Sequence, residues 1–443
     1  MAAALRLRTI SRTTIPAAAA ENFPLNALDH AMAEGLAEVV YFYRHTLDPV
    51  LLQQSLRRTL QDFPLLCGQL RSEPDGSLSI GYPHPGVPFT VSECNLPLAE
   101  ITSGLHEAYT VYDFIEKINP LLLKRKSRPL ATFRLTRMNG GGSALGISCA
   151  HAAADGYSFY YFINRWSQVH EGLPVSRPWH ERSVLSFDAA AAPALLKLAL
   201  TFLARRNSMV CRVLRFTLPQ LAAIKNAAGQ QGPVSVNDAL SAHLWQFCTK
   251  LQNAADHSAP RRLLFGAGMR SKFDHPLSRH YFGNLISNAV VACRVGELTG
   301  GAIASIAGAC RQSVAALDGD YLKEQLRWLG QQEKNKQMLR VFADVNPYAG
   351  DCVISSLFRL PVYEASFNGH KPFWAGVPAV PIPWVLYFIP APGENGGIDV
   401  YANLPRSAAD KLRRDEWQAE LYKYGSADNS AVAGEPDALQ TPG

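Results

Sequence analysis

The chain has 443 residues and a net charge of +6, with 47% hydrophobic and 18% charged residues. This composition is typical of a folded globular protein and excludes an intrinsically disordered chain. The charge is modest and no long basic run occurs, so we expect no nucleic-acid partner. A chain of this length exceeds one compact core and predicts two domains of about 200 residues each.

The eight cysteines are scattered through the chain and include no Cys-x-x-Cys pair. This pattern favours neither a disulfide framework nor a metal site, and we expect no bound metal. Because free thiols persist in a reducing compartment, we expect a cytoplasmic location. Residues 5–15 alternate as a first strand does. No apolar segment precedes a cleavage site, so we expect no secretory signal.

Residues 189–204 form the most apolar stretch of the chain, but they include Pro193 and Lys197. The stretch is shorter than a bilayer span, so we expect no membrane-spanning segment. We interpret it as part of a connector between two halves, and an interfacial membrane helix is the alternative. The predicted organisation is an N-terminal domain over 1–185, a crossover linker over 186–212, a C-terminal domain over 213–425 and a disordered tail over 426–443.

The most informative segment of the first half runs from residue 135 to residue 166. Residues 135–142 predict a strand that enters an Asn-Gly hairpin turn. The next strand follows, with Leu145, Ile147 and Cys149 alternating onto one face. Residues 152–154 and Gly156 are small. A helix is predicted from there, and its apolar stripe is formed by Phe159, Phe162, Ile163 and Trp166.

His151 stands directly after that strand, and Asp155 follows four residues later. A histidine at a strand end, facing open space left by small residues, suits general-base chemistry near neutral pH. His-x-x-x-Asp spacing also occurs by chance, and most such histidines are satisfied core or surface residues. The strand, hairpin and helix around this pair favour the catalytic interpretation.

The second half predicts a further set of strands and helices in a mixed order. A strand over 212–218 is followed by a helix opened by Pro219, and Ser235 with Asp238 forms the capping box of a second helix. The remaining predicted elements are strands at 261–269 and 288–295, mostly helical residues 302–336, a buried strand at 352–357, a hairpin of 385–389 with 398–402, and a last helix capped by Ser407 and Asp410 that ends near Tyr424.

Together these segments resemble the BAHD acyltransferases, a branch of the chloramphenicol-acetyltransferase-like superfamily. The resemblance rests on residues 23–29 and 40–43, the helix and Pro-Leu-x-Gly-x-Leu segment at 51–70, the His151–Asp155 motif, and residues 235–245 and 281–284. Their order and spacing agree from about residue 5 to residue 420. The resemblance implies an α/β fold with two chloramphenicol-acetyltransferase-like domains, each a mixed sheet flanked by helices.

The resemblance also implies a mechanism, in which an acceptor hydroxyl attacks an acyl-CoA thioester directly with His151 as the general base. No Gly-x-Ser-x-Gly elbow is present, so a serine acyl-enzyme is not indicated. One interpretation is that Asp155 orients His151 as in a triad, whereas the family's aspartate turns away and pairs with an arginine, here Arg270. The alternative for Arg270 is a surface residue after a strand. Asn284 is expected near the active centre, where its amide would donate to the oxyanion or hold a water; the alternative is a turn-forming residue after Gly283.

One segment departs from the family pattern. Where relatives carry Asp-Phe-Gly-Trp-Gly-Lys-Pro, this chain has Ser-Phe-Asn-Gly-His-Lys-Pro at residues 366–372. The family motif is structural, so its change questions local packing more than activity. We expect Ser366 and Asn368 to bond to nearby backbone. His370 is a candidate second base, although a loop histidine is more often solvent-facing.

The resemblance places acceptor contacts at Ser355, Ser356 and Arg359, and a core strand is the alternative for this segment. We therefore predict a cytoplasmic, monomeric acyl-CoA-dependent O-acyltransferase that acts on a small-molecule alcohol, with no bound cofactor and with coenzyme A thioester as co-substrate. Acylation of an amine, a carrier-protein thioester as donor, and a non-catalytic binding protein of the same fold remain alternatives. The acyl group is not predicted.

Overall fold

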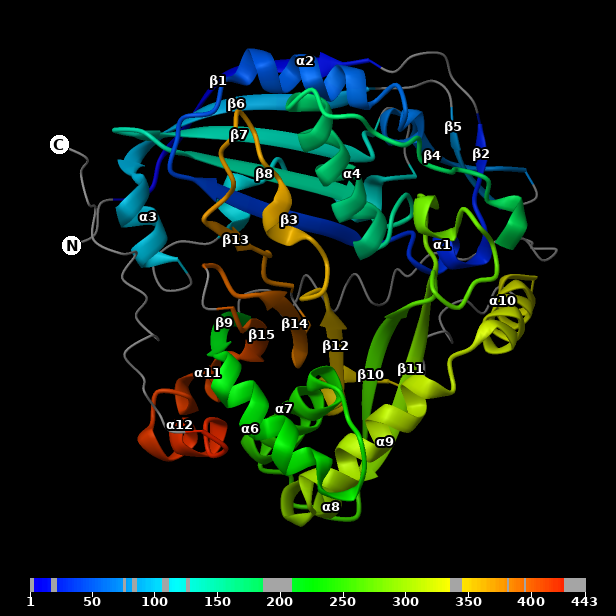
Figure 1. Ribbon diagram of the computed structural model, residues 1–443, viewed down its shortest axis with the longest axis vertical. Coiled ribbons are helices and arrows are strands. Elements are labelled where there is room, and N and C mark those ends of the chain that lie inside the picture. The colour runs from blue at the N-terminus through cyan, green and yellow to red at the C-terminus, as the bar shows by residue number, and fades with distance from the viewer. Residues whose placement is uncertain are drawn as a thin grey trace.

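The computed structural model describes residues 4–16, 22–74, 77–81, 86–105, 111–124, 128–185, 209–334, 345–380, 382–393 and 396–425. It has two halves, each built on a six-stranded mixed sheet with helices packed against it (Figure 1). The predicted α/β fold with two sheet-rich domains is therefore confirmed. Residues 186–208 of the linker predicted over 186–212, and the predicted tail over 426–443, lie outside the described residues, whereas residues 209–212 belong to a strand.

The sheet of the first half takes its strands mainly from the first 150 residues. Its order is β1 (Leu7–Ile15), β6 (Val87–Pro97), β7 (Ala131–Asn139), β8 (Ser143–Ala150), β3 (Leu36–Tyr43) and β13 (Trp374–Gly376). Only β6 and β7 are parallel neighbours. A small second sheet has the order β2 (Phe23–Pro24), β5 (Leu78–Gly81) and β4 (Gln69–Ser72). The helices of this half are α1 (Ala27–Ala31), α2 (Pro49–Thr59), α3 (Leu98–Gly104) and α4 (Gly156–His170).

The sheet of the second half has the order β11 (Ile286–Arg294), β10 (Pro260–Gly268), β12 (Cys352–Ser356), β14 (Val385–Pro390), β15 (Ile398–Pro405) and β9 (Met209–Phe216). Strand β12 is parallel to both of its neighbours, and the other pairs are antiparallel. The helices are α6 (Leu218–Ala228), α7 (Val236–Gln252), α8 (Val295–Gly300), α9 (Ile303–Ala315), α10 (Gly319–Lys334), α11 (Arg406–Lys411) and α12 (Asp415–Leu421).

Strand β8 is buried along its whole length, on both faces and not only on the predicted one. The reason is visible at Gly146, where an added Cβ would lie 2.0 Å from the carbonyl oxygen of Phe114. The segment that contains Phe114 therefore covers the second face of the strand. The hairpin before β8 forms as predicted, with Gly140, Gly141 and Gly142 all at positive φ.

Helix α4 buries the predicted stripe of Phe159, Phe162, Ile163 and Trp166 against the first sheet. It begins at Gly156, and the side chain of Asp155 caps it by accepting the Ser158 amide at 2.8 Å. Capping fixes the carboxylate at the start of the helix and the preceding turn beside it. The role of Asp155 as a helix cap was not predicted from the sequence.

The two halves are joined by chain that crosses between them. Strand β13 comes from the second half of the sequence but pairs with Val40–Phe42 of β3 in the first sheet. Tyr401 of β15 donates to the carbonyl of Ala375 at 2.9 Å. This crossing covers only part of the edge of β3 and leaves Leu36–Val39 without a strand partner on that side among the described residues.

Two predictions about the second half need correction. The last helix is not capped by Ser407 and Asp410, because α11 begins after Pro405 without a side-chain cap. It is also two short helices, since the chain turns at 412–414 before α12. The mostly helical segment 302–336 divides into α9 and α10. By contrast, the Ser235–Asp238 capping box forms as predicted.

Candidate active site

The backbone holds His151 where β8 gives way to α4. Its amide donates to the carbonyl of Gly35 at 2.9 Å, in the residue that precedes β3. An added Cβ at Gly35 would lie 3.1 Å from the Cβ of His151. Glycine at position 35 therefore allows the backbone segments of Gly35 and His151 to approach closely. The His151 ring remains partly exposed, as a proton acceptor for a bound substrate must be.

Asn284 fixes the orientation of the His151 ring. Its side-chain nitrogen donates to Asp29 Oδ1 and to the His151 carbonyl, both at 2.8 Å. Its side-chain oxygen is thereby directed at His151 Nδ1, 3.0 Å away. Since an amide oxygen only accepts, Nδ1 carries the ring proton and Nε2 keeps its lone pair. This arrangement prepares Nε2 to act as a base.

The same contacts revise the expected role of Asn284. Both hydrogens of its amide are taken, by Asp29 and by the His151 carbonyl. In this arrangement the amide has no hydrogen left to donate to an oxyanion. The position near the active centre agrees with the sequence, whereas the geometry favours a positioning role.

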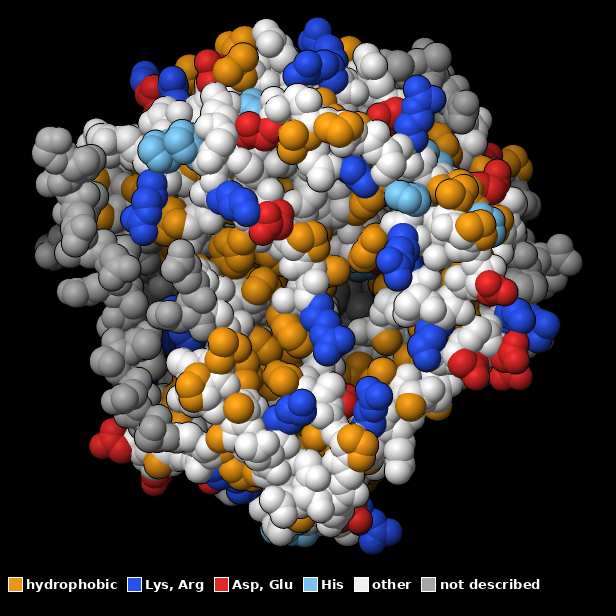
Figure 2. Space-filling view, in the orientation of Figure 1, with side chains coloured by type: hydrophobic (Ala, Val, Ile, Leu, Met, Phe, Trp, Pro, Cys, Tyr) orange, Lys and Arg blue, Asp and Glu red, His pale blue; other side chains and the backbone are white. Residues whose placement is uncertain are grey.

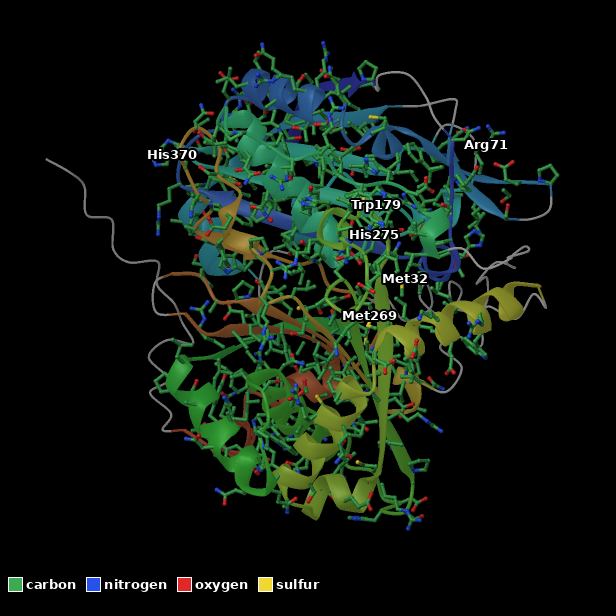
Figure 3. The ribbon with its side chains drawn as sticks, turned by 45° about the vertical axis from the view of Figure 1, so that its right-hand side comes forward. Met32, Arg71, Trp179, Met269, His275 and His370 are labelled. Carbon is green, nitrogen blue, oxygen red and sulfur yellow. The ribbon has the colours of Figure 1, made fainter. Side chains whose placement is uncertain are left out.

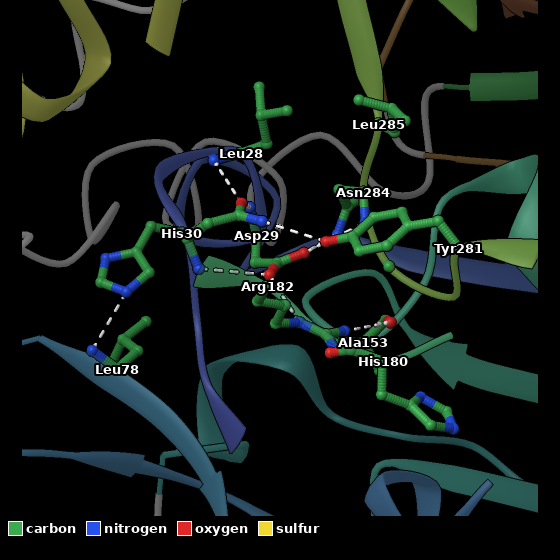
Figure 4. A network of polar contacts seen from close by, with 12 residues as sticks. Leu28, Asp29, His30, Leu78, Ala153, His180, Arg182, Tyr281, Asn284 and Leu285 are labelled. Atoms are coloured by element: carbon green, nitrogen blue, oxygen red, sulfur yellow. Dashed lines mark hydrogen bonds and ion pairs between the residues drawn. The ribbon is translucent and has the colours of Figure 1, made fainter. Parts of the chain in front are cut away.

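Asp29 anchors Asn284 from a buried position in α1 (Figure 4). One carboxylate oxygen accepts from both the backbone and the side chain of Asn284, at 3.1 and 2.8 Å. The other pairs with Arg182 Nε at 2.8 Å. Burial opposes the positive charge of Arg182, but the Asp29 carboxylate, together with Tyr281 and Glu181, outweighs burial and raises the pKa of the guanidinium.

Asp29 and Arg182 were not predicted as site residues. Asn26 and Asp29 form a capping box at the start of α1, which is a local signal in the sequence. That signal explains a helix start and says nothing of Asn284, which is 255 residues away. Arg182 follows α4 in a segment without a recognisable motif, and its second contact, with the carbonyl of Ala153 at 3.1 Å, braces the turn after His151.

Asp155 does not orient His151. Its carboxylate forms a two-pronged pair with Arg270, at 2.7 and 3.0 Å, as the family pattern implies. It also accepts the Leu285 amide at 3.0 Å. Burial alone would raise the pKa of Asp155, but the charge and hydrogen bonds of Arg270 and the backbone amides hold it below its usual value.

Arg270 connects the two halves around this carboxylate. Its Nη2 donates to Ser158 Oγ at 2.7 Å and to the carbonyl of Gly283 at 3.1 Å. Its guanidinium also lies over the ring of Tyr157, 4.3 Å from the centroid. The turn after β8 and helix α4 are thus bonded to the segment that carries Asn284. These bonds hold the ring of His151 and the side chain of Asn284 in fixed relative positions.

The predicted acceptor residues lie at the end of β12. Ser355 and Ser356 are partly exposed, and Arg359 is exposed with its guanidinium 5.7 Å from the ring centroid of Phe358. A Cβ on Gly156 would lie 2.9 Å from Leu357, so this segment passes beside the start of α4. The segment that carries these three residues therefore lies next to residues 151–155, the turn between β8 and α4, which we call the catalytic turn.

The altered segment 366–370 is held by a carboxylate from the first half. Glu171 Oε1 accepts from Ser366 Oγ at 3.2 Å and from the Gly369 amide at 2.8 Å. Asn368 contacts His170, and the ring of His370 stacks on His45 with centroids 3.6 Å apart. Ser366 and Asn368 thus bond to side chains of another element and not, as expected, to nearby backbone.

His370 lies far from the catalytic turn. It stacks on His45, which follows β3, whereas His151 bonds to Gly35, which precedes β3, and Figure 3 shows His370 well apart from Trp179. Trp179 accepts the amide of Phe282 at 2.9 Å, close to Asn284 in the chain. A role for His370 as a second base is not supported by this position.

Figure 2 shows the surface hollowed between the two halves, with hydrophobic side chains in the hollow and several basic ones at its rim. A separate cavity of about 500 Å³ is lined by Leu5, Leu7, Asp113, Ile115, Glu116, Lys117 and Arg134. It contains none of the predicted site residues, and Arg134 pairs with Glu116 at 2.7 Å. The polar network described above lies instead at the turn after β8.

The described part of the chain contains no helix long and apolar enough to cross a membrane. It also contains no cluster of three or more His, Cys, Asp or Glu side chains arranged to hold a metal ion.

Comparison with known proteins gives a consistent match over most of the chain. The sequence model of a family described as "Transferase family" matches residues 5–418. Hydroxycinnamoyltransferase of Narcissus pseudonarcissus is 24% identical over 82% of this chain and 88% of its own. Putrescine hydroxycinnamoyltransferase 1 of Oryza sativa subsp. japonica is 26% identical over 90% and 94%.

Solved structures share the fold at low identity. Vinorine synthase superposes with a TM-score of 0.74 at 17% identity, covering 94% of this chain and 98% of its own. F. graminearum TRI101 complexed with ethyl coenzyme A also gives 0.74, at 16% identity, covering 90% and 98%. The two-domain fold expected from the motifs is the fold of these proteins.

Proposed function

The chain belongs to the BAHD acyltransferases and is therefore an acyltransferase, and on that premise we propose that it transfers an acyl group from a coenzyme A thioester to a hydroxyl of a small molecule. His151 acts as the general base in this proposal. The observation that carries it is the contact between Asn284 Oδ1 and His151 Nδ1, which favours the tautomer whose lone pair is on Nε2.

The reaction needs one base and no covalent enzyme intermediate. His151 Nε2 takes the hydroxyl proton while the acceptor oxygen attacks the thioester carbonyl. The tetrahedral intermediate then breaks its carbon–sulfur bond, and the imidazolium returns the proton to the departing thiolate. Atoms and charge balance within this one exchange. Asp155 and Arg270 serve as positioning residues that hold the turn in shape.

The donor and acceptor assignments rest on different support. TRI101 structures are described as complexed with coenzyme A, which supports a coenzyme A thioester as the co-substrate. The relatives include a shikimate O-hydroxycinnamoyltransferase and a putrescine hydroxycinnamoyltransferase, so both hydroxyl and amine acceptors occur among them. We propose a hydroxyl acceptor in contact with Ser355, Ser356 and Arg359, with amine acylation as the second candidate. The continuous network around His151 argues against a non-catalytic binding protein.

A panel assay tests this function. The purified protein is incubated with acetyl-, malonyl-, benzoyl- and p-coumaroyl-CoA, each with and without alcohol and amine acceptors, and thiol release and ester or amide product are measured. We expect acceptor-dependent thiol release with at least one donor and its loss in His151→Ala. The absence of release with every pair, from a folded protein that binds acyl-CoA, would contradict the proposal. Amide products alone would replace the hydroxyl acceptor with an amine.

A further inference from the structure

Glu38 is an ionisable side chain that the proposed mechanism does not use, although it lies close to the catalytic turn. It stands on β3, directly opposite Ser148 of β8, and its Oε1 accepts from Ser148 Oγ at 2.8 Å. The described residues provide no other hydrogen bond to the carboxylate and no cation within 4.0 Å of it. One oxygen of Glu38 is therefore left for a ligand.

The position of Glu38 is set by the uncovered edge of β3. Gly35, which accepts the His151 amide, precedes Glu38 by three residues, or about 10 Å of extended strand. Strand alternation puts Glu38 on the face opposite to Gly35. Strand β13 covers only Val40–Phe42, so the edge of Leu36–Val39 has no strand partner on that side among the described residues. A ligand that crosses this edge meets the carboxylate on one side and His151 on the other.

The surroundings of Glu38 combine burial with partial solvent access. Its side chain keeps partial solvent access, yet burial raises its pKa to about 6, although the Ser148 hydrogen bond and the Lys117 charge lower it. Tyr387 of β14, in the second half, is near enough to be affected by the Glu38 charge, since burial followed by that charge raises the pKa of its phenol to about 12. A carboxylate that is desolvated but reachable, and has no ion-pair partner, favours a cationic ligand.

The second-half neighbour of Glu38 is on the acceptor side. Tyr387 pairs in register with Ser355, so the two side chains lie on the same face of the second sheet. Ser355 is one of the three residues expected to contact the acceptor. A free carboxylate also repels the phosphates of coenzyme A, which disfavours a position along the donor.

We propose that Glu38 is a specificity-determining residue that binds a cationic group, such as an ammonium, carried by the acceptor at a distance from its nucleophile. This inference deepens the proposed transfer reaction and rests on it for the identity of the bound molecule. It selects acceptors such as amino alcohols and diamines over neutral alcohols of the same shape.

The test uses two alcohols of matched shape, 4-(trimethylammonio)butan-1-ol and its carbon isostere 5,5-dimethylhexan-1-ol. The fixed charge does not titrate, so any pH effect belongs to the protein. Wild type and Glu38→Gln are compared by kcat/KM for each alcohol, with the acyl-CoA found active in the panel assay. We expect the preference for the cationic alcohol to fall at least tenfold in Glu38→Gln, and less in Ser148→Ala. An unchanged preference overturns the proposal, and so does a change confined to the KM of the acyl-CoA.

The pH dependence and a binding measurement separate this proposal from the catalytic one. Because protonation removes the Glu38 charge, the KM for the cationic alcohol should rise as the pH falls below about 6 in wild type and stay flat in Glu38→Gln. Calorimetric titration of both alcohols, without any acyl-CoA, measures the same discrimination in the absence of turnover. Discrimination without transfer contradicts the proposed function alone, whereas transfer without discrimination overturns the role of Glu38. A melting curve checks that each variant is folded.

Discussion

Two buried carboxylate–arginine pairs flank His151, and they hold different parts of it. Asp155 and Arg270 are 0% and 6% exposed and bind backbone groups of both halves. Asp29 and Arg182 are 0% and 2% exposed, and Asp29 binds the side chain that orients the imidazole. The first pair therefore maintains the shape of the catalytic turn, and the second maintains the direction of one lone pair. Chemically similar pairs should thus give different losses when broken.

The largest expected loss is at His151, the proposed base. His151→Ala removes Nε2, and we expect turnover to fall roughly 100- to 10,000-fold because general-base catalysis contributes about that much. The melting temperature should change little, since the ring is only partly buried. Steady-state kinetics and a melting curve measure both, with the exposed His257→Ala as a matched control. A variant that keeps most of the wild-type rate would contradict the proposed mechanism. The loss of rate in His151→Ala is also the reference against which the losses from breaking the two pairs are compared.

Breaking the cross-half pair should cost stability first. Asp155→Ala and Arg270→Ala each leave a buried charge without its partner, which costs about 3–5 kcal/mol. We expect each to lower the melting temperature and the rate, with the double variant far from additive because the two side chains touch at 2.7 Å. Chemical denaturation of the four proteins measures this coupling. Additive losses would show that the residues do not interact.

The same pair predicts an acid limit. Folding lowers the pKa of Asp155, so the pair contributes stability above the unfolded value of about 3.9 and loses it as the pH falls through the lower folded value. Asp155→Asn, which does not titrate, should lose this part of the acid dependence. An identical slope of stability against pH in this window for both proteins would exclude Asp155 as its source.

Breaking the pair of Asp29 and Arg182 should lower kcat by more than the loss of stability alone would cause. Asp29→Asn weakens the hold on Asn284, and loss of such a supporting contact typically costs roughly 10- to 100-fold in activity. Asp29→Asn also leaves the buried charge of Arg182 without its partner. The double variant Asp29→Asn with Arg182→Met should therefore regain stability without regaining the rate. The comparison uses kcat and melting temperature for both variants. Full recovery of kcat in the double variant would show that Asp29 acts only through the fold.

The two pairs also differ in how far the sequence predicts them. His151, Asp155 and Arg270 lie in motifs whose order resembles a family, so the pair between distant segments could be expected. Asp29 pairs with Arg182 and Asn284 through contacts that span more than 150 residues and leave only a local capping signal. The burial of both faces of β8 was likewise missed, because it depends on the loop packed over Gly146. Local patterns specify elements, whereas packing between distant segments assigns the partners.

The smallest effect on the rate is expected at the altered segment 366–370. The carboxylate that holds this loop belongs to Glu171 and lies far from His151, so it serves as a contrast to both pairs. Glu171→Ala removes two hydrogen bonds, one from Ser366 and one from the Gly369 amide. Hydrogen bonds to a charged group contribute about 1.5–3 kcal/mol each when they are well buried. The loss of stability should be smaller here because Gly369 is exposed. We expect a lower melting temperature with a rate within about tenfold of wild type.

His370→Ala should also keep its rate within about tenfold of wild type, because one base suffices for the proton transfer and the His370 ring stacks on His45. Single-turnover kinetics separate the chemical step from donor binding, since a displaced loop can change donor affinity without touching the base. A loss of the chemical step in either variant that matches His151→Ala would mean that this loop belongs to the catalytic machinery.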